Sequence, residues 1–107
     1  MTPDAAAHEL DVATPDGHAY RLLARLPASP RRALLWLPAL GVAARHYLPF
    51  AEAMAARGVA AFVHEWRGNG SSNLRADRAH DWGYRELLVQ DIPSSSAAID
   101  AVLPPGV

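Results

Sequence analysis

Apolar and polar residues alternate along two segments near the start of the chain. Residues 8–12 and Ala19–Leu26 both show the two-residue period of a strand with one buried face. Between them, residues 14–17 (Thr-Pro-Asp-Gly) supply turn chemistry, because proline presets φ and glycine tolerates a positive φ. The pattern therefore predicts an antiparallel hairpin.

Two continuous apolar runs follow the hairpin. Residues 33–37 and Val59–Val63 are apolar throughout, which is typical of strands covered on both faces in a parallel sheet. Between them, residues 47–57 place apolar side chains at i, i+3, i+4 and i+7, the spacing of a helix. Pro49 suits the first turn of that helix, and Gly58 suits the position after its last turn. This order predicts a strand–helix–strand unit with a right-handed crossover.

The rest of the chain is predicted to contain turns and two helices. Residues 64–73 are rich in turn-forming residues, and residues 84–90 can form a short helix. Asp91 is expected to cap a second helix, which ends before Pro104 and Pro105. The predicted fold class is α/β, with an N-terminal antiparallel hairpin, at least two parallel strands and flanking helices.

Length and composition indicate a single globular unit over residues 1–107. The chain has 107 residues, of which 50% are hydrophobic, and a formal net charge of −1. A net charge this close to zero does not favour binding to nucleic acid or to an anionic membrane surface. No apolar run approaches the ~18 residues of a membrane span. The absence of cysteine excludes disulfides, thiolate zinc sites and cysteine nucleophiles. Because the first residues do not resemble a signal peptide, we expect a cytoplasmic protein, and we expect no cofactor.

Each of the two predicted buried strands leads into a distinctive segment. The first reads Leu-Leu-Trp-Leu-Pro-Ala-Leu-Gly at 34–41, and the second reads Val-His-Glu-Trp-Arg-Gly-Asn-Gly-Ser-Ser at 63–72. In this order, with a helix between them, they resemble the N-terminal part of the α/β-hydrolases, in the branch with serine aminopeptidase-like and monoacylglycerol lipase-like members. The resemblance extends over roughly residues 10–103.

The resemblance implies a role for both segments. In the family the first strand ends in a loop, commonly His-Gly-x-Gly, whose backbone N–H groups help to form an oxyanion hole. Pro38 and Ala39 stand here in place of His-Gly. The implied donor is the backbone N–H of Leu40, with a merely structural loop as the alternative. The family's second motif, Asp-x-Arg-Gly-x-Gly-x-Ser, is matched at Arg67, Gly68, Gly70 and Ser72.

The residue types of the second segment also suit a structural role without the family. Glycines at 68 and 70 permit a sharp exit from a strand. Arg67 offers a rigid set of donors that can tie loops together through carbonyls and carboxylates. We therefore expect Arg67 to be buried and paired, and Ser71 or Ser72 to satisfy backbone groups of the turn. Glu65 departs from the family pattern, which has aspartate at that position.

No serine has the setting of a catalytic nucleophile in this family. The α/β-hydrolase elbow requires Gly-x-Ser-x-Gly after a strand. Leu74 stands two residues after Ser72, and no glycine flanks Ser94, Ser95 or Ser96. The resemblance therefore implies the N-terminal portion of an α/β-hydrolase domain, without the nucleophile elbow, the later strands or any triad residue.

Two functions remain open for such a chain. The first is the N-terminal part of a serine hydrolase that acts on ester, thioester or amide bonds of a small-molecule acyl substrate. This chain would supply an oxyanion-hole loop and would be inactive alone. The second is a non-catalytic α/β binding or scaffold module, complete as it stands. A Gly-x-Ser-x-Gly sequence encoded beyond Val107 would favour the first.

A metal site and a phosphate-binding loop are weaker interpretations than structural roles. Residues 68–72 lack the lysine of a P-loop, and Asn73 occupies the third-glycine position of a dinucleotide fingerprint. The candidate metal ligands lack the i, i+4 spacing of a zinc-binding helix. They are His46, His64 and His80, with Glu65 and Asp81.

The aromatic residues and one strand edge carry two further expectations. Trp66, Trp82 and Tyr84 are expected to pack the turn rather than to line a substrate pocket. In α/β-hydrolases, the strand corresponding to residues 33–37 lies between that of Val59–Val63 and the first strand beyond this chain's end. One of its edges would be unpaired here, so we expect self-association or pairing with a complementary fragment through residues 34–37.

Overall fold

The computed structural model describes residues 6–77 and 81–107. Its strands are β1 (Ala6–Ala13), β2 (Ala19–Leu26), β3 (Arg32–Trp36) and β4 (Val59–Val63). Its helical segments are the 3₁₀ turn η1 (Ala44–Tyr47), α1 (Leu48–Ala55), α2 (Tyr84–Glu86), the π-helical turn η2 (Leu87–Asp91) and α3 (Ile92–Val102). The fold class is α/β, as the sequence predicts.

One mixed sheet contains all four strands, in the order β1-β2-β4-β3. The hairpin pairs β1 with β2 over its full length, from Ala6 opposite Leu26 to Ala13 opposite Ala19. The β2 strand also pairs antiparallel with β4, where Leu23 lies opposite Val63. The β3 and β4 strands are parallel. The predicted hairpin and parallel pair are therefore confirmed, and β2 joins them into one sheet.

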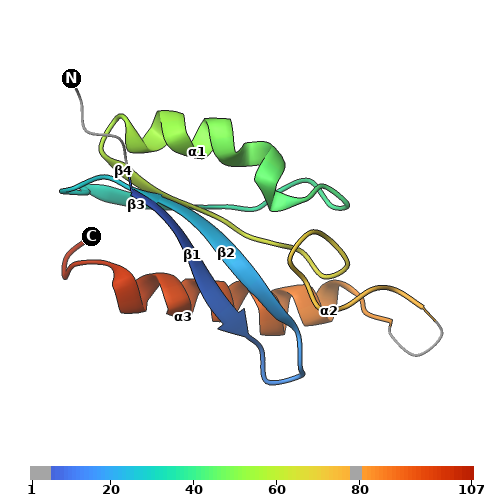
Figure 1. Ribbon diagram of the computed structural model, residues 1–107. Coiled ribbons are helices and arrows are strands. Elements are labelled where there is room, and N and C mark those ends of the chain that lie inside the picture. Colours follow the sequence, from blue (N-terminus) through green and yellow to red (C-terminus); the bar gives the residue numbers. More distant parts are fainter. Residues whose placement is uncertain (1–5, 78–80) are drawn as a thin grey trace.

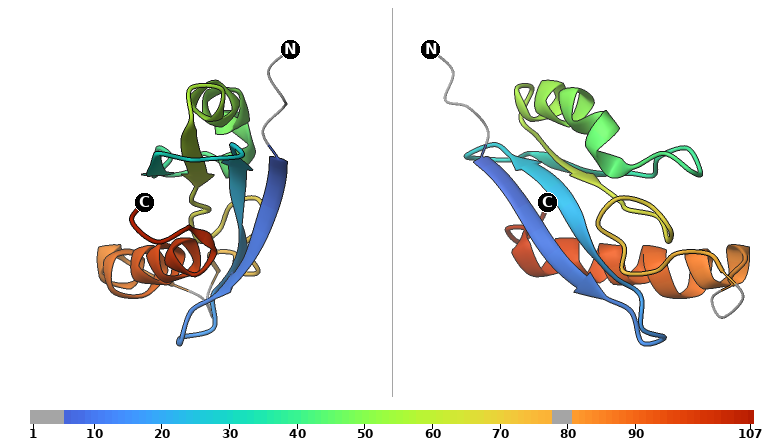
Figure 2. Two further views of the ribbon diagram at one scale, coloured as in Figure 1. Left: turned by 90° about the vertical axis from the view of Figure 1, so that its left-hand side faces the viewer. Right: turned by 45° about the vertical axis from the view of Figure 1, so that its right-hand side comes forward.

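Helices cover both faces of the sheet. Figures 1 and 2 show α1 on one face, and α2 with α3 on the other. Alternate residues of β4 serve the two cores, because successive side chains of a strand point to opposite faces. Ala60 and Phe62 join the core that includes Ile99 of α3, whereas Ala61 and Val63 join the core beneath η1 and α1. The central strand β4 is thus buried on both sides, as its apolar run predicts.

The β3 strand forms one edge of the sheet and, within the described residues, pairs with β4 alone, so the free edge that the resemblance implies is present. Its faces are less covered than its apolar run by itself predicts. Trp36 remains 36% exposed, although its ring lies 4.8 Å from that of Phe50, centroid to centroid. Leu37 lies just outside the strand and is 41% exposed. An edge position explains this exposure, because no neighbouring strand shields the outer side.

The helical region near the C-terminus also differs from its prediction. The segments α2, η2 and α3 follow one another without a break, and Asp91 does not cap a helix, because its own backbone is helical and its side chain caps nothing. The N–H of Ile92 donates to the carbonyl of Leu87, which is a π-type bond. Pro93 accounts for the wide turn, since its ring lacks an N–H and would crowd the carbonyl four residues earlier. None of the helices in the described residues is long and apolar enough to cross a membrane.

We expect the exposed edge of β3 to drive association between copies of this chain. Light scattering should show a mass that rises with concentration, because unpaired strand edges are templates for another strand. Ala33→Lys should reduce the association, since a charge on the edge disfavours pairing. Ala53→Lys on the exposed side of α1 adds the same charge elsewhere and should leave the association unchanged. A cooperative monomer at high concentration, with slowly exchanging amides throughout 34–37, would contradict this expectation.

Candidate functional site

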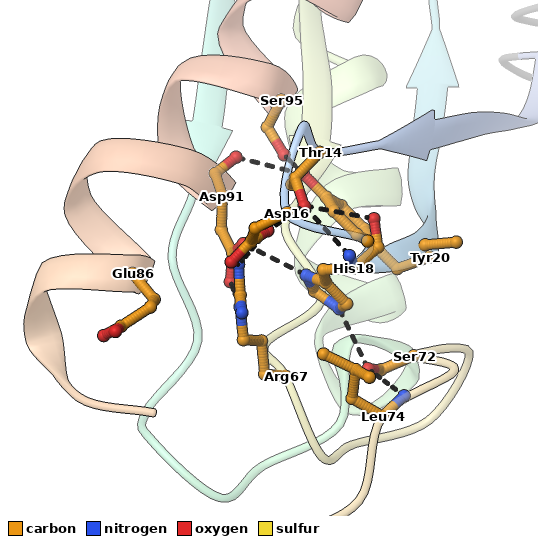
Figure 3. A network of polar contacts seen from close by, with 12 residues as sticks. Thr14, Asp16, His18, Tyr20, Arg67, Ser72, Leu74, Glu86, Asp91 and Ser95 are labelled. Atoms are coloured by element: carbon orange, nitrogen blue, oxygen red, sulfur yellow. Dashed lines mark hydrogen bonds and ion pairs between the residues drawn. The ribbon is translucent and has the colours of Figure 1, made fainter. Parts of the chain in front are cut away.

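Arg67 lies at the centre of a buried polar network just beyond the end of β4 (Figure 3). It is 7% exposed, and its Nε and Nη2 atoms donate to the carboxylate of Asp91 at 2.8–3.0 Å. Nη2 also donates to Oδ1 of Asp16 at 2.7 Å. Burial alone would lower the pKa of Arg67, but the bonds to Asp91 and Asp16 outweigh it and raise that pKa. Arg67 is therefore buried and paired, as the sequence predicts.

Asp91 ties the C-terminal helical segment to the hairpin. Its side chain is fully buried in the π turn, and its Oδ1 lies 3.1 Å from Nδ1 of His18. Burial works to raise the pKa of the Asp91 carboxyl, but the close approach of His18 and the hydrogen bonds from Arg67 outweigh it and hold that pKa below its usual value. The carboxylate therefore stays ionised near neutral pH and accepts the hydrogen bonds of Arg67.

The hairpin turn presents its polar residues to this network. The hydroxyl of Thr14 accepts the N–H of His18 at 3.0 Å and donates to Oδ1 of Asp16. Gly17 has a φ of +98°, which permits the tight return of the chain. Burial would raise the pKa of Asp16, but the bonds from Thr14 and Arg67 lower it. The turn predicted from sequence thus also anchors the arginine.

A second branch of the network links the sheet to α3. The Tyr20 hydroxyl donates to the carbonyl of Asp91 at 3.1 Å and is bonded to the Ser95 hydroxyl. The Ser95 hydroxyl is also 2.7 Å from Nδ1 of His64, whose Nε2 is buried with no hydrogen-bond partner among residues 6–77 and 81–107. Burial raises the pKa of Tyr20 to about 12 and lowers the pKa of His64 to about 4. Both groups are therefore neutral near pH 7.

Ser72, His18 and Asp91 lie next to one another in the order of a catalytic triad, but Nδ1 of His18 makes no well-aligned hydrogen bond to Asp91, and the serine lacks the freedom of a nucleophile. His18 Nε2 lies 2.9 Å from the Ser72 hydroxyl. That hydroxyl also accepts the N–H groups of Gly68 at 3.3 Å and Leu74 at 3.1 Å. Ser72 is 6% exposed and His18 is fully buried. The arrangement satisfies the turn, as expected from the sequence, and leaves the oxygen no access to a substrate.

A cleft of about 440 Å³ lies beside this network, beyond the carboxyl ends of β3 and β4. The loop after β3, the segment after β4 and the start of α2 form its walls. Its larger side chains are Leu40, Trp66, Arg67, Trp82, Tyr84 and Leu87. Ligands of parallel sheets bind beyond the carboxyl ends of the strands, so the position suits a binding site.

Leu40 lies at this cleft in a tight turn. The N–H of Val42 donates to the carbonyl of Ala39 at 3.0 Å, and Gly41 has a φ of +85°, as the third residue of a type II turn requires. Leu40 is 54% exposed, and its own N–H has no hydrogen-bond partner among the described residues. An unpaired N–H beside a cleft can donate to an oxygen of a ligand.

Glu65 and Trp66 connect the two loops that border the cleft. Glu65 is 4% exposed, and its Oε2 accepts the N–H of Ala44 at 2.6 Å while its Oε1 accepts the N–H of Ser71 at 2.8 Å. The indole of Trp66 donates to the carbonyl of Pro38 at 2.6 Å. Sequence reasoning missed these three contacts. The sequence feature that could have pointed to them is Glu65, which stands where the α/β-hydrolase motif has aspartate.

The glycine-rich loop after β4 uses its own N–H groups internally. The N–H of Ser72 donates to the carbonyl of Asn69, and the N–H of Asn69 donates to the carbonyl of Trp66. The Glu65 carboxylate takes the N–H of Ser71. These bonds favour the structural turn over a phosphate-binding loop.

The histidines and aromatic residues singled out from sequence have different surroundings. His64 is buried, His46 is exposed in η1, and His80 lies outside the described residues. No group of three metal-ligating side chains occurs in the parts of the chain that the structure describes. Trp66, Trp82 and Tyr84 all line the cleft, and the ring of Trp82 also lies against Gly68 of the turn. Ser95 is buried in the network, beside the less buried Ser94 and Ser96.

We expect Arg67→Ala to lower the free energy of unfolding by about 3–5 kcal/mol, because it leaves the buried charge of Asp91 without its main partner. Chemical denaturation would measure the loss. Arg57→Ala is the matched control, since Arg57 is exposed and its side chain has no partner among the described residues. Equal stability of the two variants would refute the central role of Arg67.

Stability should fall as the pH drops from 6.5 toward 4, since the pKa of His64 is about 4 in the folded chain and near 6.5 when unfolded. The unfolded state then binds the extra proton, and the loss reaches about 3 kcal/mol. Burial lowers this pKa, the charge of His18 lowers it further, and the charge of Asp91 opposes them. His64→Asn should flatten the dependence over this range. An unchanged pH slope in that variant would exclude His64 as the cause.

No serine of the folded chain should react stoichiometrically with a fluorophosphonate probe. The Ser72 hydroxyl is buried and hydrogen-bonded to His18 and to the N–H groups of Gly68 and Leu74, and Ser95 is fully buried. Mass spectrometry of the treated chain would detect any adduct, with an active serine hydrolase as the positive control. Labelling of Ser72 would mean that its contact with His18 does activate it.

Comparisons with known proteins indicate the fold and not the chemistry. No family model and no curated protein sequence matches the chain. Among solved structures, the chain is similar to DcsB in complex with its substrate analogue, with a TM-score of 0.64 and 19% sequence identity. The match covers 92% of this chain and 33% of the DcsB chain. The chain thus has the fold of part of an enzyme and spans about a third of that enzyme's length.

Proposed function

We propose that the chain is the N-terminal part of a serine hydrolase of the α/β-hydrolase type, acting on ester, thioester or amide bonds. The cleft with the unpaired Leu40 N–H at its border is the observation that carries this proposal. In the proposed enzyme this N–H stabilises the negative oxygen of a tetrahedral intermediate. The nucleophile, the base and the acid come from sequence outside this chain.

The topology of the sheet supports a continuation of the domain. The connection from β3 to β4 runs through α1 on one face, whereas α3 lies on the other face (Figure 1). Parallel crossovers are right-handed in about 98% of cases. A parallel strand following α3 would therefore fall on the far side of β3, at its free edge. This is the place where a strand carrying the nucleophile elbow would extend the sheet.

The likeness to DcsB supports the same proposal. That protein was solved with a substrate analogue, and this chain matches only 33% of its length. From this share of the length we infer which part of such an enzyme provides which groups. The described part provides the floor of a cleft and one donor, and the remaining two thirds of such an enzyme provide the reacting groups.

The cleft also indicates what kind of group binds in it. Its larger side chains are mostly aromatic or aliphatic, and the charge of Arg67 is matched by Asp16 and Asp91. An apolar acyl group therefore fits between the walls, with its oxygen at the Leu40 N–H. A non-catalytic binding or scaffold module is the second candidate, and the dense polar network beneath the cleft would serve it equally well.

Binding of 4-phenylbutyrate, which carries an apolar body and a charged oxygen, tests this proposal on the chain itself. Leu40→Pro removes the N–H, and proline is favoured at the second position of a type II turn. Leu40→Ala keeps the N–H and serves as the control. Losing one hydrogen bond to a charged group costs about 1.5–3 kcal/mol, so Leu40→Pro should weaken binding about 10- to 100-fold. NMR titration would give both affinities.

Two outcomes of this titration would contradict the proposal. The first is equal affinity of Leu40→Pro and Leu40→Ala for 4-phenylbutyrate. The second is binding that leaves the amide signals of Leu40 and Gly41 unmoved, because the ligand would then lie away from the turn. Either result would favour the scaffold module, which has no need of the Leu40 N–H.

A further inference from the structure

The carboxylate of Glu65 hydrogen-bonds to both loops at the cleft. Its Oε2 accepts the N–H of Ala44, where the loop after β3 enters η1, at 2.6 Å. Its Oε1 accepts the N–H of Ser71, in the loop after β4, at 2.8 Å. Both are close hydrogen bonds. The Glu65 side chain thus links the two loops and sets the distance between them.

The surroundings of Glu65 are shaped to its length. Gly70 has a φ of +46°, and a Cβ at this position would overlap the carboxylate of Glu65. The loop therefore lacks a side chain at the place where the carboxylate lies. Aspartate is one methylene shorter, so its oxygens could not reach the N–H groups of Ala44 and Ser71 together without moving a loop.

The neighbouring contact makes the same connection from the other side of the turn. Trp66 donates its indole N–H to the carbonyl of Pro38, two residues before Leu40. Glu65 holds the loop at Ala44, four residues after Leu40. The Leu40 turn is therefore fixed at both ends by consecutive residues of the segment after β4. A loop held at both ends keeps its free N–H in one place, which is the condition for a preorganised donor.

We propose that Glu65 is the positioning residue of the Leu40 donor, and that its contacts with Ala44 and Ser71 place that N–H relative to the aromatic wall of the cleft. This inference rests on the proposed function. Glu65 does not touch the ligand. It acts by holding the loop after β3 against the loop after β4.

Glu65→Asp and Glu65→Gln test the proposal in the full 107-residue chain. Aspartate is too short to hold both loops, and glutamine offers only one acceptor oxygen for two N–H groups. Both should move the Leu40 amide signal of the free chain and weaken 4-phenylbutyrate binding about five- to tenfold. Ile99→Val, a core change on α3, controls for a general loss of stability, and should leave the Leu40 signal and the affinity unchanged.

A double-mutant cycle isolates the contact between Gly70 and Glu65. Gly70→Ala adds a methyl group against the carboxylate and also strains the positive φ. The strain is the same in every background, whereas the overlap is relieved when Glu65 is shortened. Gly70→Ala should therefore lower the melting temperature by at least about 4 °C less in the Glu65→Asp background than in the original chain.

The outcomes separate the two proposals. If Leu40→Pro weakens binding and Glu65→Asp neither weakens it nor moves the Leu40 signal, the positioning role is refuted and the proposed function stands. If Leu40→Pro has no effect, the proposed function fails first. A fully additive cycle between Gly70 and Glu65 would also overturn the account of how the carboxylate is held.

Discussion

The buried ion pair between Arg67 and Asp91 is the constraint on which the arrangement of this chain depends. It joins the segment after β4 to the middle of the C-terminal helix, and Asp16 and His18 bring the hairpin turn to the same point. A buried charge without its partner is strongly destabilising, so these three segments are stable only together. The cleft is lined by the same segment after β4, so the ion pair also holds the floor of the cleft in place.

The sequence predicts the parts of this fold that depend on local chemistry. The bounds of β2 and β4 agree with their apolar patterns, and the turn between β1 and β2 follows from proline and glycine. The burial of Arg67 also follows, because its guanidinium offers several donors to the carbonyl and carboxylate acceptors of a tight loop. These are consequences of residue type and spacing, which can be read without knowing which segments meet.

Contacts between distant segments are beyond such reasoning. Asp91 looks like a helix cap from its neighbours, and its true partners lie 24 residues away at Arg67 and on the hairpin at His18. Glu65 meets an N–H that is 21 residues away in the sequence. The π turn requires both Pro93 and a helix that continues past it, and periodicity alone does not reveal that continuation. The exposure of β3 depends on strand order rather than on its own residues, and it was expected only because the resemblance implies a free edge at this strand.

The same network explains why the chain has a cleft but no reacting group within it. His18, Ser72 and Asp91 are aligned as in a triad, yet the serine is enclosed by the turn that it stabilises. The polar side chains of the network hold loops together, and the Leu40 N–H beside the cleft has no hydrogen-bond partner among the described residues. A donor without a nucleophile is what the proposed N-terminal part of a hydrolase would contribute.

Determining the coding sequence that follows the Val107 codon is the most direct test of this account. The account predicts an apolar strand within a short distance, suited to the free edge of β3, followed at once by Gly-x-Ser-x-Gly and a helix. A stop codon directly after Val107 in the natural gene, or a continuation without that elbow, would contradict the account and favour the self-contained binding or scaffold module.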